Sequence, residues 1–320
     1  MICLEDIRAA SARVAERARF VRIEREPLER LALELADEAK EPAKLDPAHH
    51  HLGGEAETLA YVVTLDAINF GSGWFPLLRK RPGCSGYFTV ATALRERFAS
   101  EGAFSANELR SLDATAVAEL LGQDVEQPEV GELMEHFARA LRDLGEFLRT
   151  RHEGSFEVLV ARAEASAEHL VRELAVMQCY RDVSTYDGFE VPFYKRAQLT
   201  AADLAIAFEG KGPGRFDDLA RLTIFADNLV PHVLRCEGVL VYCRDLAEQI
   251  DGEQPIGAGS PQEIEIRAVA LHAVERMVES LSERAGTGVT AQRLDHLLWN
   301  RGQAPAIKAR PRHRARSVFY

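Results

Sequence analysis

One carboxylate stands out because it lies within an apolar stretch of the chain. Asp227 falls inside residues 223–235, and the apolar residues around it recur at helical spacing: Phe225, Leu229, Val230, Val233 and Leu234. A buried ionised carboxylate is costly unless it is paired or hydrogen-bonded. The position therefore indicates either an acid with a chemical role or a structural ion pair with Arg221 or Arg235. Pro231 cannot donate an N–H to the Asp227 carbonyl, so the helix either kinks or restarts beside the acid.

A lysine directly follows two aromatic residues, at Phe193-Tyr194-Lys195. The pattern is compatible with a half-buried aromatic pair whose basic neighbour reaches solvent. It is equally compatible with a cation that lines a pocket near Asp227, where each group would shift the pKa of the other.

Aromatic and histidine residues also gather in the first quarter of the chain. Asn69 and Phe70 precede a Gly-Ser-Gly run followed by two more aromatic residues, which suits stacking on a planar heterocycle. The alternative is an aromatic core corner with the glycines ending a helix. The three histidines at 49–51 have no acidic partner at ligand spacing, so we expect no metal site there. His51 could donate a hydrogen bond or act as a general acid.

The end of the chain carries a further group of polar residues. Asp295, Trp299 and Arg301 close the last expected helix. Residues 308–320 form a basic tail, which usually indicates solvated disorder or loose anion binding. This tail ends on Ser-Val-Phe-Tyr320, and those apolar residues favour docking on the body of the protein.

The composition limits the class of protein. With 320 residues, 47% hydrophobic and 28% charged, the chain resembles an ordinary globular protein. Its 39 basic and 50 acidic residues give a net charge of −11, which argues against a stable nucleic-acid partner but allows one small phosphorylated ligand. No apolar run is long enough to span a membrane and no signal-peptide pattern opens the chain, so we expect a cytoplasmic protein with no membrane partner. The five cysteines form no C-x-x-C pair, and no motif for a phosphate loop, a nucleophile elbow or a zinc protease occurs.

The expected architecture is mainly α, a compact multi-helix domain over residues 1–320 whose first fifty residues are the least certain. The expected helices span residues 4–17, 27–40, 55–68, 85–99, 114–121, 130–150, 156–178 (with a possible break), 199–208, 216–250, 262–285 and 290–298. Ser105 and Thr200 each precede an acid by three residues, the spacing of a capping box. Strand-like alternation is confined to residues 189–194. The loop at 209–215 could be a phosphate-gripping glycine hairpin, although a plain turn fits the order of its glycines better.

Four uncommon strings occur in an order that resembles the queuosine salvage family, the queuosine 5′-phosphate N-glycosylases/hydrolases. They are Ile68-Asn-Phe70, Phe193-Tyr-Lys-Arg-Ala-Gln198, Phe225-Ala-Asp-Asn-Leu-Val-Pro231 and Arg314-Ala-Arg-Ser-Val-Phe-Tyr320. The resemblance covers the chain from about residue 59 to residue 320.

The resemblance implies an all-α fold related to helix-hairpin-helix DNA glycosylases. It implies hydrolysis of the N-glycosidic bond of queuosine 5′-phosphate, which releases queuine for reuse in tRNA, without a metal or an organic cofactor. Asp227 matches the family's catalytic carboxylate and Lys195 its pocket lysine. Five residues fall in or near the matching motifs: Phe193, Tyr194, Asn228, Arg235 and Tyr242. The clusters above complete the expected substrate-binding set with His51, Asn69, Phe70, Asp295, Trp299 and Tyr320. Family members are associated with an aromatic residue where this chain has Asn228, so the contact made by that side chain is open.

The implied reaction passes through an oxocarbenium-like transition state, with positive charge on C1′ of the sugar. Asp227 could stabilise this charge, attack it, or deprotonate the incoming water. The 7-deazaguanine base lacks the N7 that purine glycosylases often protonate, so its departure must be assisted through other atoms. His51, Asp295 or a tightly bound water could donate the proton. Lys195 could orient Asp227, hold the phosphate or lower the pKa of the carboxyl, and a Schiff base is not needed for hydrolysis.

Two other classes of protein compete with the enzyme. A non-catalytic tRNA or nucleic-acid binding module on the same scaffold predicts steeply salt-dependent binding and no activity on mononucleotides. A helical adaptor predicts no pocket around Lys195 and Asp227. The chain's acidity and the resemblance favour the enzyme.

Overall fold

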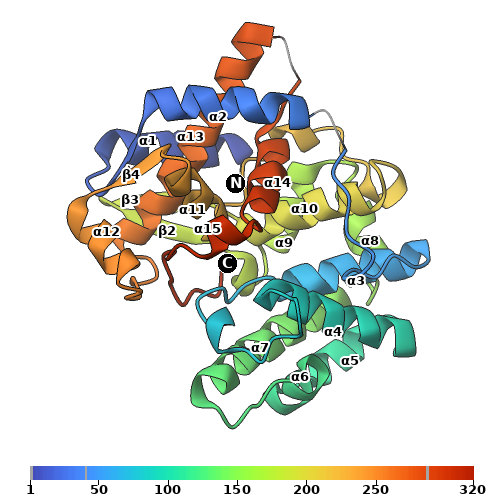
Figure 1. The fold of residues 1–320 in the computed structure, drawn as a ribbon. Helices are drawn as coiled ribbons and strands as arrows, with labels where there is room; N and C mark the ends of the chain where they lie inside the picture. The colour runs from blue at the N-terminus through green and yellow to red at the C-terminus, as the bar shows by residue number, and fades with distance from the viewer. Residues whose placement is uncertain (1–2, 40–41, 286–287) are drawn as a thin grey trace. The chain divides into compact units, whose positions relative to one another are not determined.

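Helices dominate the fold because apolar side chains recur at about every 3.6 residues through most of the chain. The computed structural model describes residues 3–39, 42–285 and 288–320, and it is mainly α, as the sequence predicts (Figure 1). The described residues contain two short antiparallel sheets: β1 (Val21–Ile23) pairs with β4 (Leu240–Tyr242), and β2 (Val183–Tyr186) pairs with β3 (Phe189–Pro192). None of the helices in the described ranges combines the length and the apolar composition that crossing a membrane requires.

The described residues form two compact units. The first lies within Met1–Ala43, Asp182–Lys195 and Ala220–Ala315, and the second within Lys44–Arg181, Arg196–Leu219 and Arg316–Tyr320. The expectation of one domain over residues 1–320 stays a prediction.

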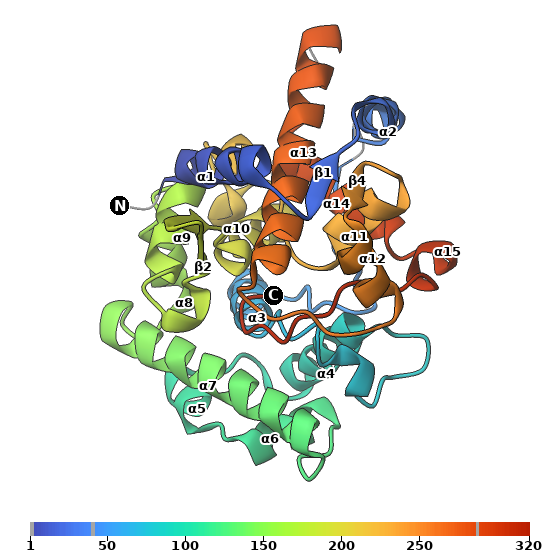
Figure 2. The ribbon, with the colours of Figure 1, turned by 90° about the vertical axis from the view of Figure 1, so that its left-hand side faces the viewer.

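The first unit is built on the long helix α13 (Pro261–Ala285), which packs against other helices and β1 (Figure 2). Buried residues along α13, among them Ile264, Ala268 and Leu271, supply much of its core. The other helices of this unit are α1 (Leu4–Arg17), α2 (Arg25–Glu38), α11 (Leu229–Cys236), α12 (Arg244–Asp251), α14 (Ala291–Arg301) and α15 (Pro305–Lys308).

The β2–β3 hairpin of the first unit is closed by two residues with positive φ. Tyr186 pairs with Phe189, and Asp187 and Gly188 between them have φ angles of 44° and 82°. Asp-Gly is the preferred pair for a two-residue hairpin turn of this kind. The hairpin confirms strand character at 189–192, and the Asp-Gly turn was the signal for its unpredicted partner β2.

The second unit is built on α7 (Pro128–Arg151), which packs against α5, α6 and α3 (Figure 2). Gly145 permits a close approach of α7 to α5, because a Cβ there would lie 2.6 Å from the Ala106 carbonyl oxygen. The remaining elements are α3 (Glu55–Ala67), α4 (Gly86–Glu101), α5 (Ala106–Ser111), α6 (Ala114–Leu121), α8 (Phe156–Ala161), α9 (Ala167–Leu174), and the 3₁₀ turns η1 (Phe75–Leu77), η2 (Gln178–Tyr180) and η3 (Gly212–Gly214). Helix α10 (Lys195–Ala207) lies in this unit except for Lys195.

Several predicted elements differ from the observed ones. The helix expected over 216–250 is wrong: this stretch contains the 3₁₀ turn η4 (Leu219–Arg221), an irregular segment, α11, β4 and α12. The predicted break in 156–178 is confirmed, because α8 ends at Ala161 and α9 begins at Ala167. Ser105 forms the predicted capping box with Glu108. Thr200 is not a cap, because it lies inside α10 and donates its hydroxyl to the Arg196 carbonyl at 2.9 Å.

Candidate active site

Asp227 lies in the irregular segment just ahead of α11, not on the face of a helix. Its Oδ1 accepts the backbone N–H groups of Leu229 at 2.7 Å and Val230 at 3.1 Å, so the carboxylate caps α11. Pro231 occupies the first turn, where the N–H that it lacks would have no partner within the helix. The helix therefore restarts beside the acid and does not kink there.

The second oxygen of the Asp227 carboxylate differs from the first in its contacts. Within the described residues Oδ2 has no hydrogen-bond partner, and the residue keeps partial exposure to solvent. In the same part of the chain no ion pair joins Asp227 to Arg221 or Arg235, and Arg235 pairs with Asp251 at 2.9 Å. The alternative of a structural ion pair for Asp227 is therefore wrong. One oxygen of its carboxylate is held by backbone N–H groups, and the other can contact a ligand.

Asp295, on α14, supplies a second carboxyl next to this segment. It is only 5% exposed, and its Oδ1 accepts the backbone N–H of Phe225 at 2.8 Å. Burial and then the nearby charge of Asp227 raise the pKa of the Asp295 carboxyl to about 7. The Phe225 hydrogen bond and the Lys195 ammonium act in the opposite direction. Asp295 is thus a carboxyl that can hold its proton near neutral pH.

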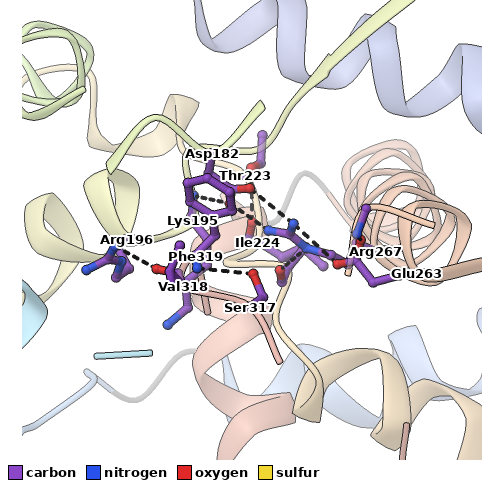
Figure 3. A network of polar contacts seen from close by, with 12 residues as sticks. Asp182, Lys195, Arg196, Thr223, Ile224, Glu263, Arg267, Ser317, Val318 and Phe319 are labelled. Carbon is purple, nitrogen blue, oxygen red and sulfur yellow. Dashed lines mark hydrogen bonds and ion pairs between the residues drawn. The ribbon is translucent and has the colours of Figure 1, made fainter. Parts of the chain in front are cut away.

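A buried ion pair between Arg267 and Asp182 supports the same segment from α13 (Figure 3). The two guanidinium nitrogens donate to the Asp182 oxygens at 3.1 and 2.6 Å, and Glu263 lies 3.5 Å away. Arg267 Nε donates to the Ala226 carbonyl at 2.8 Å, and the guanidinium lies 3.9 Å from the centre of the Phe193 ring. These contacts fix the backbone next to Asp227.

Asp182 also organises the start of α10, where Lys195 is found. Its carbonyl accepts the N–H groups of Phe193 at 2.9 Å and Tyr194 at 3.2 Å, and its Oδ2 accepts that of Lys195 at 3.3 Å. Tyr194 has a φ of 47°, a left-handed conformation that is strained for a bulky residue and that often marks functional sites. Lys195 is 5% exposed, and its charge acts on Asp295. The pairing of Lys195 with Asp227 stays a prediction.

Arg312 is a cation at this site that the sequence reasoning missed. Within the described residues no carboxylate lies within 4.0 Å of it, and its guanidinium interacts electrostatically with Asp227. Burial lowers the pKa of Arg312, although an arginine keeps its charge. Arg312 was missed because it belongs to a basic tail, a pattern that usually indicates a solvated segment. The apolar residues that end the tail were the signal that it is docked. We call Asp227, Asp295, Lys195 and Arg312 the carboxyl–cation cluster.

Three further predicted residues belong to the first unit, and each has its own surroundings: Asn228, Tyr242 and Trp299. Asn228 is 3% exposed, and its Nδ2 is buried without a hydrogen-bond partner in the described residues. Tyr242 is buried on β4, with the Arg235 guanidinium 5.0 Å from its ring centre, and its hydroxyl likewise lacks a partner in the described ranges. Trp299 is half-buried on α14, where its carbonyl accepts the Gln303 side chain at 3.2 Å.

Three predicted residues meet in the second unit. Phe70 lies edge-on to Phe137 at 5.0 Å and under the guanidinium of Arg196 at 4.5 Å, which makes it part of an aromatic core corner. Asn69 donates to Asp66 at 3.4 Å, and the Tyr320 carbonyl accepts the N–H of Gly71 at 2.9 Å.

A buried arginine holds this corner of the second unit together. Arg196 is 1% exposed and donates to the carbonyls of Ala67 and Cys179. It also donates to the Val318 carbonyl at 2.8 Å, as Figure 3 shows. Because Val318 belongs to the last residues of the chain, the apolar end of the tail is docked, as its sequence predicts.

The histidine run contacts other side chains. His49 Nδ1 lies 2.8 Å from Thr92 Oγ1, and His50 Nε2 lies 3.0 Å from the Tyr87 hydroxyl. His51 Nε2 lies 3.4 Å from the exposed carboxylate of Glu57. The role of His51 as a donor to substrate stays a prediction.

The carboxyl–cation cluster combines an oriented carboxylate, a carboxyl that titrates near neutral pH and two cations. A fixed carboxylate can stabilise positive charge that develops on a sugar carbon. Lysine and arginine side chains can bind a phosphate. The set therefore suits cleavage of a glycosidic bond in a small anionic substrate.

Comparisons with known proteins agree with this chemistry. Residues 49–320 match the model of a family described as queuosine salvage protein. A relative from Sphaerobacter thermophilus, named queuosine 5′-phosphate N-glycosylase/hydrolase, is 36% identical over 316 residues, which cover 96% of this chain and 95% of the relative. Relatives with the same name from Dictyostelium discoideum and Mus musculus are 33% and 30% identical. They cover 82% and 96% of this chain, and 78% and 96% of their own lengths.

Proposed function

The chain belongs to the queuosine salvage protein family, and we propose that it hydrolyses the N-glycosidic bond of queuosine 5′-phosphate and releases queuine. The observation that carries the proposal is the Asp227 carboxylate, which is fixed through Oδ1 by two backbone N–H groups and open at Oδ2. A carboxylate held in this way needs no reorganisation when charge develops beside it, which is the property that electrostatic catalysis uses.

In this proposal Asp227 Oδ2 faces C1′ of the ribose as the bond to the base lengthens. Stabilisation of the oxocarbenium-like charge is common to the three roles open to this carboxylate, whether or not it also attacks C1′ or deprotonates water. Lys195 lies close enough to act on the neighbouring Asp295 electrostatically, and we assign it with Asp227 to the catalytic set.

The substrate carries a 5′-phosphate, and the chain's net charge of −11 makes a local cation necessary for it. Arg312 meets this requirement, because no carboxylate of the described residues neutralises it within 4.0 Å. Lys195 is the second candidate. The aromatic and polar residues expected to contact the base and sugar are Phe193, Tyr194, Asn228, Arg235, Tyr242, Trp299, His51, Asn69, Phe70 and Tyr320.

The finer expectations about architecture and setting form part of the same proposal. We propose that residues 1–320 act as one functional unit on a scaffold related to helix-hairpin-helix DNA glycosylases. We further propose that the protein acts in the cytoplasm on the free nucleotide, without a stable nucleic-acid partner and without a metal or organic cofactor.

Incubation of the purified full chain with queuosine 5′-phosphate tests the proposal, with free queuine measured by liquid chromatography and mass spectrometry. Asp227→Ala should still bind the nucleotide but lose about 10²–10³-fold or more in kcat, because it removes charge stabilisation in the transition state. Asp245→Asn is the matched control, because it neutralises an exposed carboxylate of the same unit. Wild-type kcat in Asp227→Ala would reject its catalytic role.

The same assay separates the enzyme from a non-catalytic tRNA-binding module. The enzyme should release queuine from the mononucleotide, and its affinity for tRNA should be weak. A protein that releases no queuine but binds tRNA with a steep dependence on salt would contradict the proposed function.

A further inference from the structure

We propose that Asp295 is a positioning residue for the reaction, which holds the backbone that carries Asp227 through its hydrogen bond to the Phe225 N–H. The inference rests on the proposed function. It assigns to Asp295 a task other than contact with the substrate, which was its expected role.

The segment that carries Asp227 has no regular secondary structure of its own. Three helices of the first unit hold it at successive residues. Phe225 N–H is bound by Asp295 of α14 at 2.8 Å, and the Ala226 carbonyl is bound by Arg267 of α13 at 2.8 Å. Asp227 itself caps α11. Because an irregular segment lacks the hydrogen-bond ladder of a helix or strand, each of these three contacts limits its movement directly.

Asp295 lies near the Asp227 carboxylate, so a positioning role requires that the two carboxyl groups do not repel each other strongly. The charged groups that act on it are Asp227, ahead of α11, and Lys195, at the start of α10. On α13, the charge of Arg267 is balanced by Asp182 and Glu263.

On α11, which also packs against α14, Arg235 pairs with Asp251 at 2.9 Å, and His232 Nε2 lies 3.1 Å from the Ile307 carbonyl oxygen. On α2, Glu34 pairs with Arg301 at 3.3 Å. Burial and the Asp227 charge together keep Asp295 mostly protonated below about pH 7. A neutral carboxyl still accepts the Phe225 N–H, and it adds no second negative charge beside Asp227.

Two other roles for Asp295 predict different behaviour. A proton donor to the departing base needs the acidic proton, so an amide in its place would be inactive. A purely structural residue of α14 would affect stability but not kcat. A positioning residue needs only an acceptor of the right shape for the Phe225 N–H, which the side-chain oxygen of asparagine provides.

The experiment compares Asp295→Asn with Asp295→Ala in the full chain. Asp295→Asn should keep kcat within about threefold of wild type at pH 6.5, whereas Asp295→Ala should lose roughly 10- to 100-fold in kcat with little change in KM. Above pH 7 the wild-type kcat should fall as Asp295 ionises beside Asp227, and the profile of Asp295→Asn should stay flat. Asn300→Ala, an exposed change on the same helix, is the control.

Amide hydrogen exchange at Phe225 measures the positioning without reference to activity. Protection should be retained in Asp295→Asn and lost in Asp295→Ala, with the rest of α14 unchanged. An Asp295→Asn variant as inactive as Asp295→Ala would overturn the inference in favour of proton donation. Wild-type kcat in Asp295→Ala, with only a lower melting temperature, would overturn it in favour of a structural role. A wild-type protein that releases no queuine would contradict the proposed function instead, and the exchange result would still decide whether Asp295 holds this segment.

Discussion

Arg267 and Asp182 form a doubly hydrogen-bonded ion pair, with N···O distances of 3.1 and 2.6 Å, at 1% and 2% side-chain exposure. The pair joins two segments that are distant in sequence. Arg267 binds the Ala226 carbonyl next to Asp227, and Asp182 binds the backbone at the start of α10, where Lys195 lies. One ion pair therefore sets the backbone positions of both proposed catalytic residues.

Loss of either partner should destabilise the protein strongly. Arg267→Met leaves the Asp182 and Glu263 carboxylates buried without this cation, and Asp182→Asn removes the nearer of the two carboxylates that balance Arg267. For each change we expect a decrease of about 3–5 kcal/mol in the free energy of unfolding in urea. The double variant should cost less than the sum of the two single changes, because it removes both charges. The exposed pair between Arg314 and Glu253 is the control, and its loss should cost no more than about 1 kcal/mol. Single variants within 1 kcal/mol of wild type would show that the pair does not hold this region.

Arg312 should decide how strongly the enzyme prefers a nucleotide over a nucleoside. A hydrogen bond to a charged group contributes about 1.5–3 kcal/mol, so Arg312→Met should raise KM for queuosine 5′-phosphate by about 10- to 100-fold. The kinetics on the dephosphorylated nucleoside should change little. Steady-state kinetics on both substrates measure this preference. Arg314→Met is the matched control, because Arg314 already pairs with Glu253. Equal losses on nucleotide and nucleoside would place the phosphate elsewhere.

The parts of the fold that the sequence predicted are those in which local spacing decides structure. The expected bounds of α1 and α6 match the observed ones, because amphipathic spacing determines both helices and the Asp113 side chain caps the start of α6. The prediction failed at 216–250, where apolar residues recur at helical spacing but are buried in a loop, a short helix and a strand. Periodicity alone cannot distinguish these cases when a segment is buried on all sides.

The candidate site was predictable to the same extent. Asp227 and Lys195 were visible as polar residues in apolar or aromatic surroundings. Asp182 and Arg267 were not, because a buried ion pair between residues 85 positions apart leaves no local pattern. Arg312 belongs to a tail whose basic composition is typical of disordered segments. Only its tertiary packing distinguishes it from the other arginines of the tail.

His313 should make the protein sensitive to acid. It is 1% exposed, and within the described residues neither ring nitrogen has a hydrogen-bond partner. Burial, followed by the nearby His232 and Arg312 side chains, lowers its pKa to about 3. An unfolded histidine titrates near 6.5, so the unfolded chain binds more protons than the native one between these values. The associated stability is present in full above pH 6.5 and decreases as the pH falls toward 3.

Replacement of this histidine should therefore reduce the acid sensitivity. The free energy of unfolding of the wild type, measured in urea, should decrease from pH 7 to pH 5. Up to about 1.4 kcal/mol per pH unit of this decrease should come from His313. His313→Gln should reduce the slope by this amount, whatever its effect on stability at pH 7, because glutamine does not titrate. His169→Gln, at an exposed position on α9, should keep the wild-type slope. If His313→Gln also kept that slope, the native protein would be binding a proton at His313 in this pH range. The decrease in the free energy of unfolding at low pH would then have to arise from other groups.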